Sequence, residues 1–204
     1  VSSPSASACD SPSRAGMTDA LDRLLTSAKA DVDSGWLPAC QVAVARDDEL
    51  LAFETFGDAT NDDRFCGFST TKPIVASCVW HLIAQGSLDV SEPVAHYVPE
   101  FAEHGKGAVT VEQVLLHTAG FPNAPMSPGA GADPARRLAR LASWELEWEP
   151  GSRFEYHAGS AHYVLIELIE RLAGGDFRDV IHERVTAPLG LPRVLGLPLD
   201  QQDH

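Results

Sequence analysis

The tetrapeptide Ser69-Thr70-Thr71-Lys72 can bring a hydroxyl and an amine together. Residues three apart share one face of a helix, so the Ser69 and Lys72 side chains meet if the segment is helical. A serine at a helix start lies near free backbone N–H groups, which favour negative charge. Lysine can lose its proton and act as a general base, whereas arginine cannot. The pattern predicts a nucleophilic serine; its structural alternative is an N-cap serine followed by a solvated lysine.

A second candidate group is Tyr156, which follows a Glu-Pro-Gly turn at 149–151 and a short extended stretch. A tyrosine held near a cationic lysine has a lowered pKa and can serve as an acid or a base. The alternative is a tyrosine that only packs at the start of the next helix.

Helices must position these groups, and the apolar spacing predicts most of them. Apolar residues recur at helical intervals over 17–32, from 69 to a glycine at 86, over 164–172 and from 176 to about 185. A capping box of Thr110 and Gln113 predicts a helix over 111–117, and Asp133-Pro134 predicts one that continues to about 144. Alternation around 42–44 and 51–55 predicts a β-hairpin, and the Gly/Pro/Ala composition of 126–132 predicts a loop.

Five segments, in this order and spacing, resemble the serine β-lactamase and penicillin-binding-protein superfamily, especially its esterase-like members. They are the stretch around the S-x-x-K pattern at 68–73, the stretch 85–101, the Leu-Leu-His-Thr-Ala-Gly turn at 115–120, and the segments 148–156 and 187–191. The resemblance implies that Ser69 is the acylated nucleophile and Lys72 its activating base. It also implies that Tyr156 passes a proton to the leaving group and activates water for deacylation. The backbone N–H of Ser69 would form half of an oxyanion hole.

Two features depart from the pattern of that superfamily. Its second motif is often Tyr-x-Asn, whose Asn contacts a substrate amide, whereas here Ala158 takes the Asn position and cannot form that hydrogen bond. This difference favours an ester over a β-lactam or peptide. The third motif of the superfamily is a Lys or His, then any one residue, then Gly, on a strand. The only match after Tyr156 is His157-Ala158-Gly159, which we attribute to chance. We therefore expect that strand, and the other strands and closing helix of the family, to lie beyond His204.

The amino-acid composition limits the classes of partner that this chain can bind. The chain has 29 acidic and 15 basic residues, and its net charge of −14 repels phosphate, which excludes nucleic acid as a partner. No apolar run approaches the roughly 20 residues that span a bilayer, so we expect no membrane association. The predicted partner is a small-molecule ester or amide substrate, and the oligomeric state is left open.

Cysteine and histidine spacing gives two further expectations. The four cysteines are Cys9, Cys40, Cys66 and Cys78. Their spacing fits neither a zinc site nor a disulfide scaffold, so we expect reduced thiols and a cytoplasmic protein. The histidines include no H-E-x-x-H or comparable spacing, so we expect no metal and no cofactor. His117 fits a turn-stabilising residue better than a base.

Together these features predict an α+β fold of the β-lactamase/transpeptidase-like class. Its helical region is expected to pack on an antiparallel sheet whose C-terminal strands are absent from this chain. We expect a flexible tail over 1–16, because this stretch is rich in Ser, Pro and Ala, and one incomplete domain over 17–204. The predicted function is a serine hydrolase that acts on a small ester through an acyl-enzyme. The alternatives are a truncated or non-catalytic homologue that binds ligands or partners without turnover, and a β-lactamase or D,D-peptidase.

Overall fold

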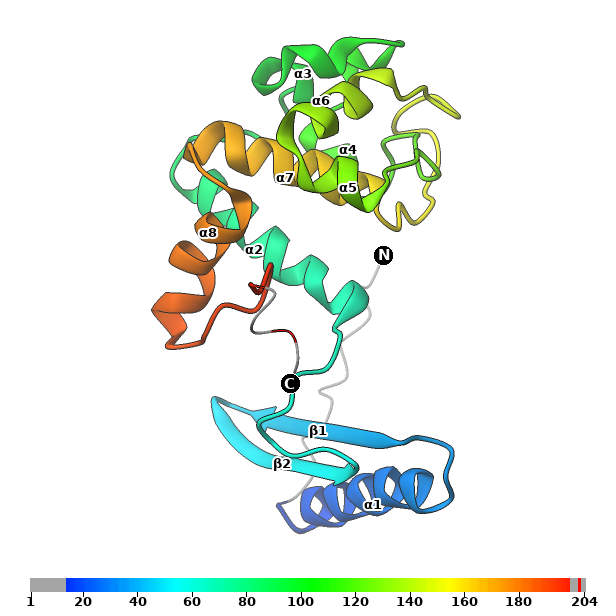
Figure 1. Ribbon diagram of the computed structural model, residues 1–204, viewed down its shortest axis with the longest axis vertical. Coiled ribbons are helices and arrows are strands. Elements are labelled where there is room, and N and C mark those ends of the chain that lie inside the picture. The colour runs from blue at the N-terminus through cyan, green and yellow to red at the C-terminus, as the bar shows by residue number, and fades with distance from the viewer. Residues whose placement is uncertain (1–13, 199–201, 203–204) are drawn as a thin grey trace, which may run out of the picture. The chain divides into compact units, whose positions relative to one another are not determined.

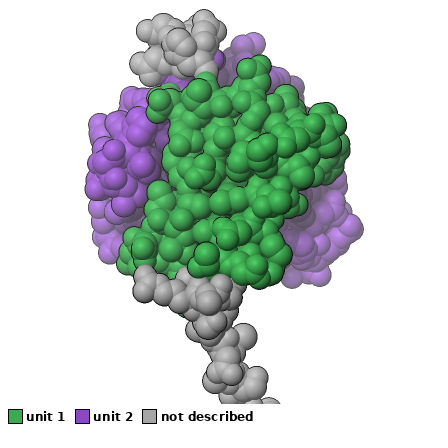
Figure 2. Space-filling model, turned by 90° about the horizontal axis from the view of Figure 1, so that it is seen from below, with its two compact units in different colours: residues 1–65, 204 green, residues 66–203 purple. Residues whose placement is uncertain are grey.

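The computed structural model describes residues 14–198 and residue 202, which form parts of two compact units. Unit 1 ends at Phe65 and unit 2 begins at Cys66; Figure 2 colours them separately. The expected tail over 1–16 lies largely outside the described residues, and its last three residues already belong to the first helix, which begins at Arg14. The single domain expected over 17–204 stays a prediction.

Unit 1 is a helix packed on a β-hairpin. Helix α1 (Arg14–Asp33) precedes strands β1 (Ala39–Arg46) and β2 (Glu49–Gly57), which pair antiparallel and confirm the predicted hairpin. The strands are joined by Asp47 and Asp48, both with positive φ (50° and 63°). Consecutive left-handed residues are the geometry of a two-residue hairpin turn, and aspartate tolerates it better than most residues. Helix α1 contacts both strands (Figure 1).

The regular secondary structure of unit 2, among its described residues, is helical apart from one isolated β-bridge, and turns and irregular loops join the helices. Its α-helices are α2 (Thr71–Ala84), α3 (Val94–Tyr97), α4 (Val111–Leu115), α5 (Pro128–Ala132), α6 (Pro134–Ser143), α7 (Ser160–Ala173) and α8 (Phe177–Ile181). Short 3₁₀ turns occupy 68–70, 99–102, 106–108 and 187–189, and a π-helical turn, His182–Thr186, continues α8. Helix α7 is the central element, since it contacts α2, α3, α4, α6 and α8 (Figure 1).

The core of unit 2 lies along the facing sides of α2 and α7. The stripe predicted on α2 is confirmed: Val75, Cys78, Val79 and Leu82 are buried. The stripe predicted on α7 is buried at Val164, Leu165, Leu168 and Ile169. Because α2 carries Lys72 in its first turn, this packing fixes the direction in which the lysine leaves the helix.

Side chains cap three helix starts, among them the two expected from the capping box and from Asp133-Pro134. Thr110 Oγ1 accepts the Gln113 N–H at 3.2 Å, and Gln113 Oε1 accepts the Thr110 N–H at 3.0 Å, which completes the capping box of α4. Asp133 and Asp176 cap α6 and α8 through their side chains. Each such cap satisfies a backbone donor that the helix leaves unpaired.

Two sequence predictions were wrong in detail. The stretch 126–132 contains the short helix α5 in place of a loop, because the Ser127 side chain caps it and Pro128 occupies its first position. The last predicted helix, 176–185, changes from α to π geometry at His182. At that point the His182 imidazole pairs with Thr186 Oγ1 at 2.8 Å, one of the local bonds that periodicity does not indicate.

Candidate active site

The turn before α2 presents Ser69. Gly67, Phe68, Ser69 and Thr70 form a 3₁₀ turn in which the Thr70 hydroxyl and N–H both bond to the Gly67 carbonyl. A Cβ on Gly67 would lie 2.6 Å from Thr70 Oγ1, so a larger residue there would displace the Thr70 hydroxyl from its bond to the Gly67 carbonyl. Phe68 has φ 41°, a left-handed conformation that is rare for a bulky residue and often marks a functional turn.

Three side chains meet at Ser69 Oγ. Lys72 Nζ donates to Ser69 Oγ at 3.2 Å, and Tyr156 Oη lies 2.8 Å from the same atom, although Tyr156 is 87 positions away in sequence. The three residues singled out from the sequence are therefore brought together. The Ser69 side chain does not cap α2, whose cap residue Thr70 makes no side-chain cap bond, so the N-cap alternative for Ser69 is wrong.

The electrostatics of this group act on the tyrosine. The hydrogen bond to Lys72 lowers the pKa of Tyr156 most, and the hydrogen bond to Ser69 lowers it further. The Lys72 ammonium also lies 5.1 Å from the centre of the Tyr156 ring. A cation beside a phenol favours the phenolate, so the Lys72–Tyr156 pair can accept a proton from a neighbouring hydroxyl.

The loop that carries Tyr156 is attached to the turn at 117–120. The backbone N–H of Glu155 donates to the His117 carbonyl at 3.1 Å, and that of Gly151 donates to the Thr118 carbonyl at 2.8 Å. Gly120 has φ 90°, and a Cβ there would lie 2.5 Å from the Trp148 carbonyl oxygen. The Leu-Leu-His-Thr-Ala-Gly segment thus positions a loop about 30 residues further along the chain.

His157 anchors the same loop from inside. Its side chain is fully buried, and its Nε2 accepts the Phe121 N–H at 3.1 Å. The Nδ1 must then carry the proton, which it donates to the Glu155 carbonyl at 2.6 Å. Burial lowers the pKa of His157 and keeps the imidazole neutral. The segment His157-Ala158-Gly159 leads into helix α7 and is not a strand, so it does not supply the third motif of the family.

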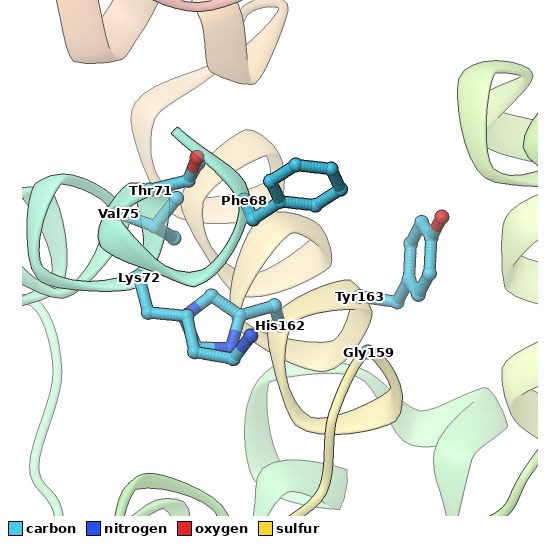
Figure 3. Close-up of a pocket in the computed structure, with 7 residues that line it drawn as sticks. All are labelled: Phe68, Thr71, Lys72, Val75, Gly159, His162 and Tyr163. Carbon is cyan, nitrogen blue, oxygen red and sulfur yellow. The ribbon is translucent and has the colours of Figure 1, made fainter. Parts of the chain in front are cut away.

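A cavity of about 230 Å³ adjoins Lys72 (Figure 3). Its lining consists of Phe68, Thr71, Lys72, Val75, Gly159, His162 and Tyr163. Phe68 comes from the turn that carries Ser69 and Tyr163 from the first turn of α7, so aromatic side chains frame the cavity. Burial lowers the pKa of His162 to about 4, so its imidazole is neutral at pH 7.

Sequence reasoning missed the cavity-lining residues Phe68 and His162. The apolar pattern marked the helices that carry the cavity walls, but no periodic signal indicates which residues at a helix start face a cavity. Trp144 is buried in the core and donates its indole N–H to the Pro125 carbonyl at 3.0 Å.

The described residues carry neither a metal-binding cluster nor a membrane-spanning helix. Residues 14–198 and 202 contain no group of three His, Cys, Asp or Glu side chains that could hold a metal ion. No helix among them is long and apolar enough to cross a bilayer. Cys40, Cys66 and Cys78 carry free thiols, and Cys9 lies outside the described residues.

Comparison with known sequences places these features in a family. The family model described as Beta-lactamase matches residues 21–198. Esterase EstB from Burkholderia gladioli is 31% identical over 217 residues, which covers 92% of this chain and 53% of that protein. The chain therefore spans about half the length of this relative.

Solved structures agree with this match. A penicillin-binding protein homologue from Caulobacter crescentus aligns with a TM-score of 0.75 and 30% identity, over 89% of this chain and 52% of that one. A family VIII carboxylesterase aligns with a TM-score of 0.75 and 27% identity, over 88% and 52%. These likenesses confirm the predicted α+β, β-lactamase-like fold class.

Proposed function

The chain belongs to the beta-lactamase family, and from that premise we propose that it carries the nucleophile of a serine esterase. The observation that supports this proposal is the meeting of Lys72 Nζ and Tyr156 Oη at Ser69 Oγ, at 3.2 and 2.8 Å. A nucleophilic serine needs an adjacent base within hydrogen-bond reach, and the coupled Lys72–Tyr156 pair is the candidate base at this site.

The proposed reaction has two halves. Ser69 Oγ attacks the carbonyl carbon of the ester, and its proton moves to the Lys72–Tyr156 pair. The tetrahedral intermediate expels the alcohol, which takes that proton, and leaves an acyl group on Ser69. Water then attacks the acyl-enzyme while the pair accepts its proton, and the proton returns to Ser69 as the acid is released. The Ser69 N–H would supply one donor of the oxyanion hole.

A short acyl chain is the proposed substrate feature. The cavity beside Lys72, about 230 Å³ in volume and framed by Phe68, Val75 and Tyr163, has room for a small apolar group. Ala158 offers no side-chain hydrogen bond for a β-lactam amide. The similarity to EstB and to a family VIII carboxylesterase supports an ester in the same way.

Substrate preference tests this part of the proposal. We expect p-nitrophenyl acetate or butyrate to be hydrolysed at least about 10²-fold faster, by kcat/KM, than nitrocefin, because the site lacks a partner for the amide. Steady-state assays of both substrates on one preparation measure the ratio. Nitrocefin hydrolysis at the rate of the esters would instead favour a β-lactamase or D,D-peptidase.

Active-site labelling tests the nucleophile itself. A fluorophosphonate should modify Ser69, as mapped by mass spectrometry of peptides, and Ser69→Ala should abolish both labelling and ester turnover. Stability should change little, since the Ser69 side chain caps no helix. Ser77→Ala is the matched control, because Ser77 lies on α2, the helix that follows Ser69, and its hydroxyl donates to the Pro73 carbonyl. Absence of labelling in the wild type would favour the non-catalytic alternative, a homologue that binds without turnover.

We also propose a cytoplasmic location, which rests on the cysteine spacing. Subcellular fractionation with an antibody against the protein tests it. Recovery of the protein outside the cytoplasmic fraction would contradict the proposal.

A further inference from the structure

Tyr156 lies on an irregular loop, so neither a helix nor a strand fixes its position. Residues 153–157 adopt neither helix nor strand, and Tyr156 is 47% exposed, so packing alone does not hold it. The proposed reaction nevertheless needs its Oη within hydrogen-bond distance of Ser69 Oγ. Some other contact must restrain the backbone on both sides of the tyrosine.

His117 makes that contact twice. Its backbone carbonyl accepts the N–H of Glu155 at 3.1 Å, and its Nδ1 accepts the N–H of His157 at 3.2 Å. These are the residues immediately before and after Tyr156. The His117 ring also lies 5.0 Å from the Tyr156 ring, centre to centre. One residue therefore holds the peptide groups on both sides of the tyrosine and contacts its ring.

The backbone of His117 allows substitutions that isolate the role of its side chain. Its φ of 58° lies in the left-handed region, which glycine adopts without strain and in which asparagine and histidine are also found. A His117→Gly change keeps the backbone carbonyl that accepts the Glu155 N–H but removes the Nδ1 acceptor of the His157 N–H. The bond to His157 therefore depends on the side chain and not on the turn.

We infer that His117 is a positioning residue that holds Tyr156 against Ser69, through an imidazole that must stay neutral. The inference rests on the proposed esterase function, because it gives Tyr156 its role. It goes beyond turn stabilisation, since the bond to His157 acts on the geometry of the proton-transferring group.

The protonation state follows from the bond. Nδ1 accepts a hydrogen bond only when it is unprotonated, so Nε2 carries the proton of the neutral ring. Burial, followed by the charges of His157 and Lys72, lowers the pKa of His117. The titratable groups facing it are Lys72 from α2, His162 from α7, and Tyr156 and His157 from the loop. His117 is therefore protonated only at a pH below the usual histidine pKa, and protonation of its Nδ1 breaks the bond to the His157 N–H.

Three variants separate positioning from stability. His117→Gly removes the acceptor but relieves the backbone, so the protein should fold. His117→Asn keeps an acceptor near the Nδ1 position and tolerates the left-handed turn. His104→Gly is the matched control, since His104 is exposed and also left-handed, with φ 55°. We expect His117→Gly to lose at least about tenfold in kcat for p-nitrophenyl acetate, because small displacements of a catalytic group have large effects. KM should change little, and His117→Asn and His104→Gly should stay within about threefold of wild type.

Two further measurements complete the test. The pH profile of kcat should lose activity on the acid side in wild type, and His117→Asn should shift that midpoint to lower pH. Hydrogen exchange of the His157 amide should be faster in His117→Gly than in wild type, whether or not the protein is active. Wild-type kcat in His117→Gly, an equal loss in His117→Asn, or an unchanged acidic midpoint would overturn the inference. An unlabelled Ser69 in wild type would overturn the proposed function instead, and amide exchange would then decide whether His117 holds the loop.

Discussion

The two units of this protein use their apolar side chains differently. No side chain among residues 18–65 is fully buried, and Trp36, Leu50 and Phe53 are exposed. In unit 2, by contrast, α2 and α7 bury most of their apolar faces, and Leu168 has no exposed surface. Unit 1 takes its form from local pairing, whereas unit 2 depends on packing between distant segments.

This difference explains where the candidate site can form. A hairpin is specified by its turn and its alternation, both of which are local. The site in unit 2 needs Ser69 and Tyr156 to meet across 87 positions of sequence. The packing of α2 against α7 and the bonds between the 117–120 turn and the Tyr156 loop supply that long-range order. The unit with the dense core is therefore the one that can position three side chains at hydrogen-bond distance.

Leucine truncation in each unit tests this comparison directly. Leu168→Ala should lower the free energy of unfolding by about 2–5 kcal/mol, because it leaves a cavity in a close-packed core. Leu25→Ala on α1 should lower it by about 1 kcal/mol, because the residue is only half-buried and less contact is lost. Urea denaturation, with the two units followed by separate probes, measures both changes. Equal losses at the two positions would contradict the contrast between the units.

Much of this architecture could be predicted from the sequence, for a physical reason. Helical periodicity marks the buried face of α2, and it correctly placed Val75, Cys78 and Leu82 in the core. The capping box of Thr110 and Gln113 is an equally local pattern, since both of its hydrogen bonds join residues three apart. Patterns of this kind need no knowledge of the tertiary structure.

The candidate site could be predicted only in part. Ser69 and Lys72 lie one helical turn apart, so their contact follows from local geometry. Tyr156 could be singled out as a possible acid or base, but its role at Ser69 came only from the resemblance to a family motif, because nothing local connects the two residues. The bond from the His157 N–H to His117 Nδ1 spans 40 positions and depends on a left-handed turn. No periodicity indicates such a contact, so the supporting role of His117 emerged only from the structure.

A lysine-to-arginine exchange in each unit sharpens the comparison between them. Lys72→Arg keeps the positive charge of the side chain, but its guanidinium cannot give up a proton at neutral pH. If Lys72 shares a proton with Tyr156 during acylation, ester turnover should fall by about 10²-fold, equivalent to about 2.7 kcal/mol. Lys29→Arg in α1 is the matched control, because Lys29 forms an exposed ion pair with Asp33 that arginine can also make. Exposed pairs contribute about 0–1 kcal/mol, so this variant should keep wild-type activity and stability. Steady-state kinetics with p-nitrophenyl butyrate and thermal melts compare the two variants. A Lys72→Arg protein that is as active as wild type would show that a fixed cation beside Tyr156 is sufficient, and that the tyrosine alone accepts the Ser69 proton.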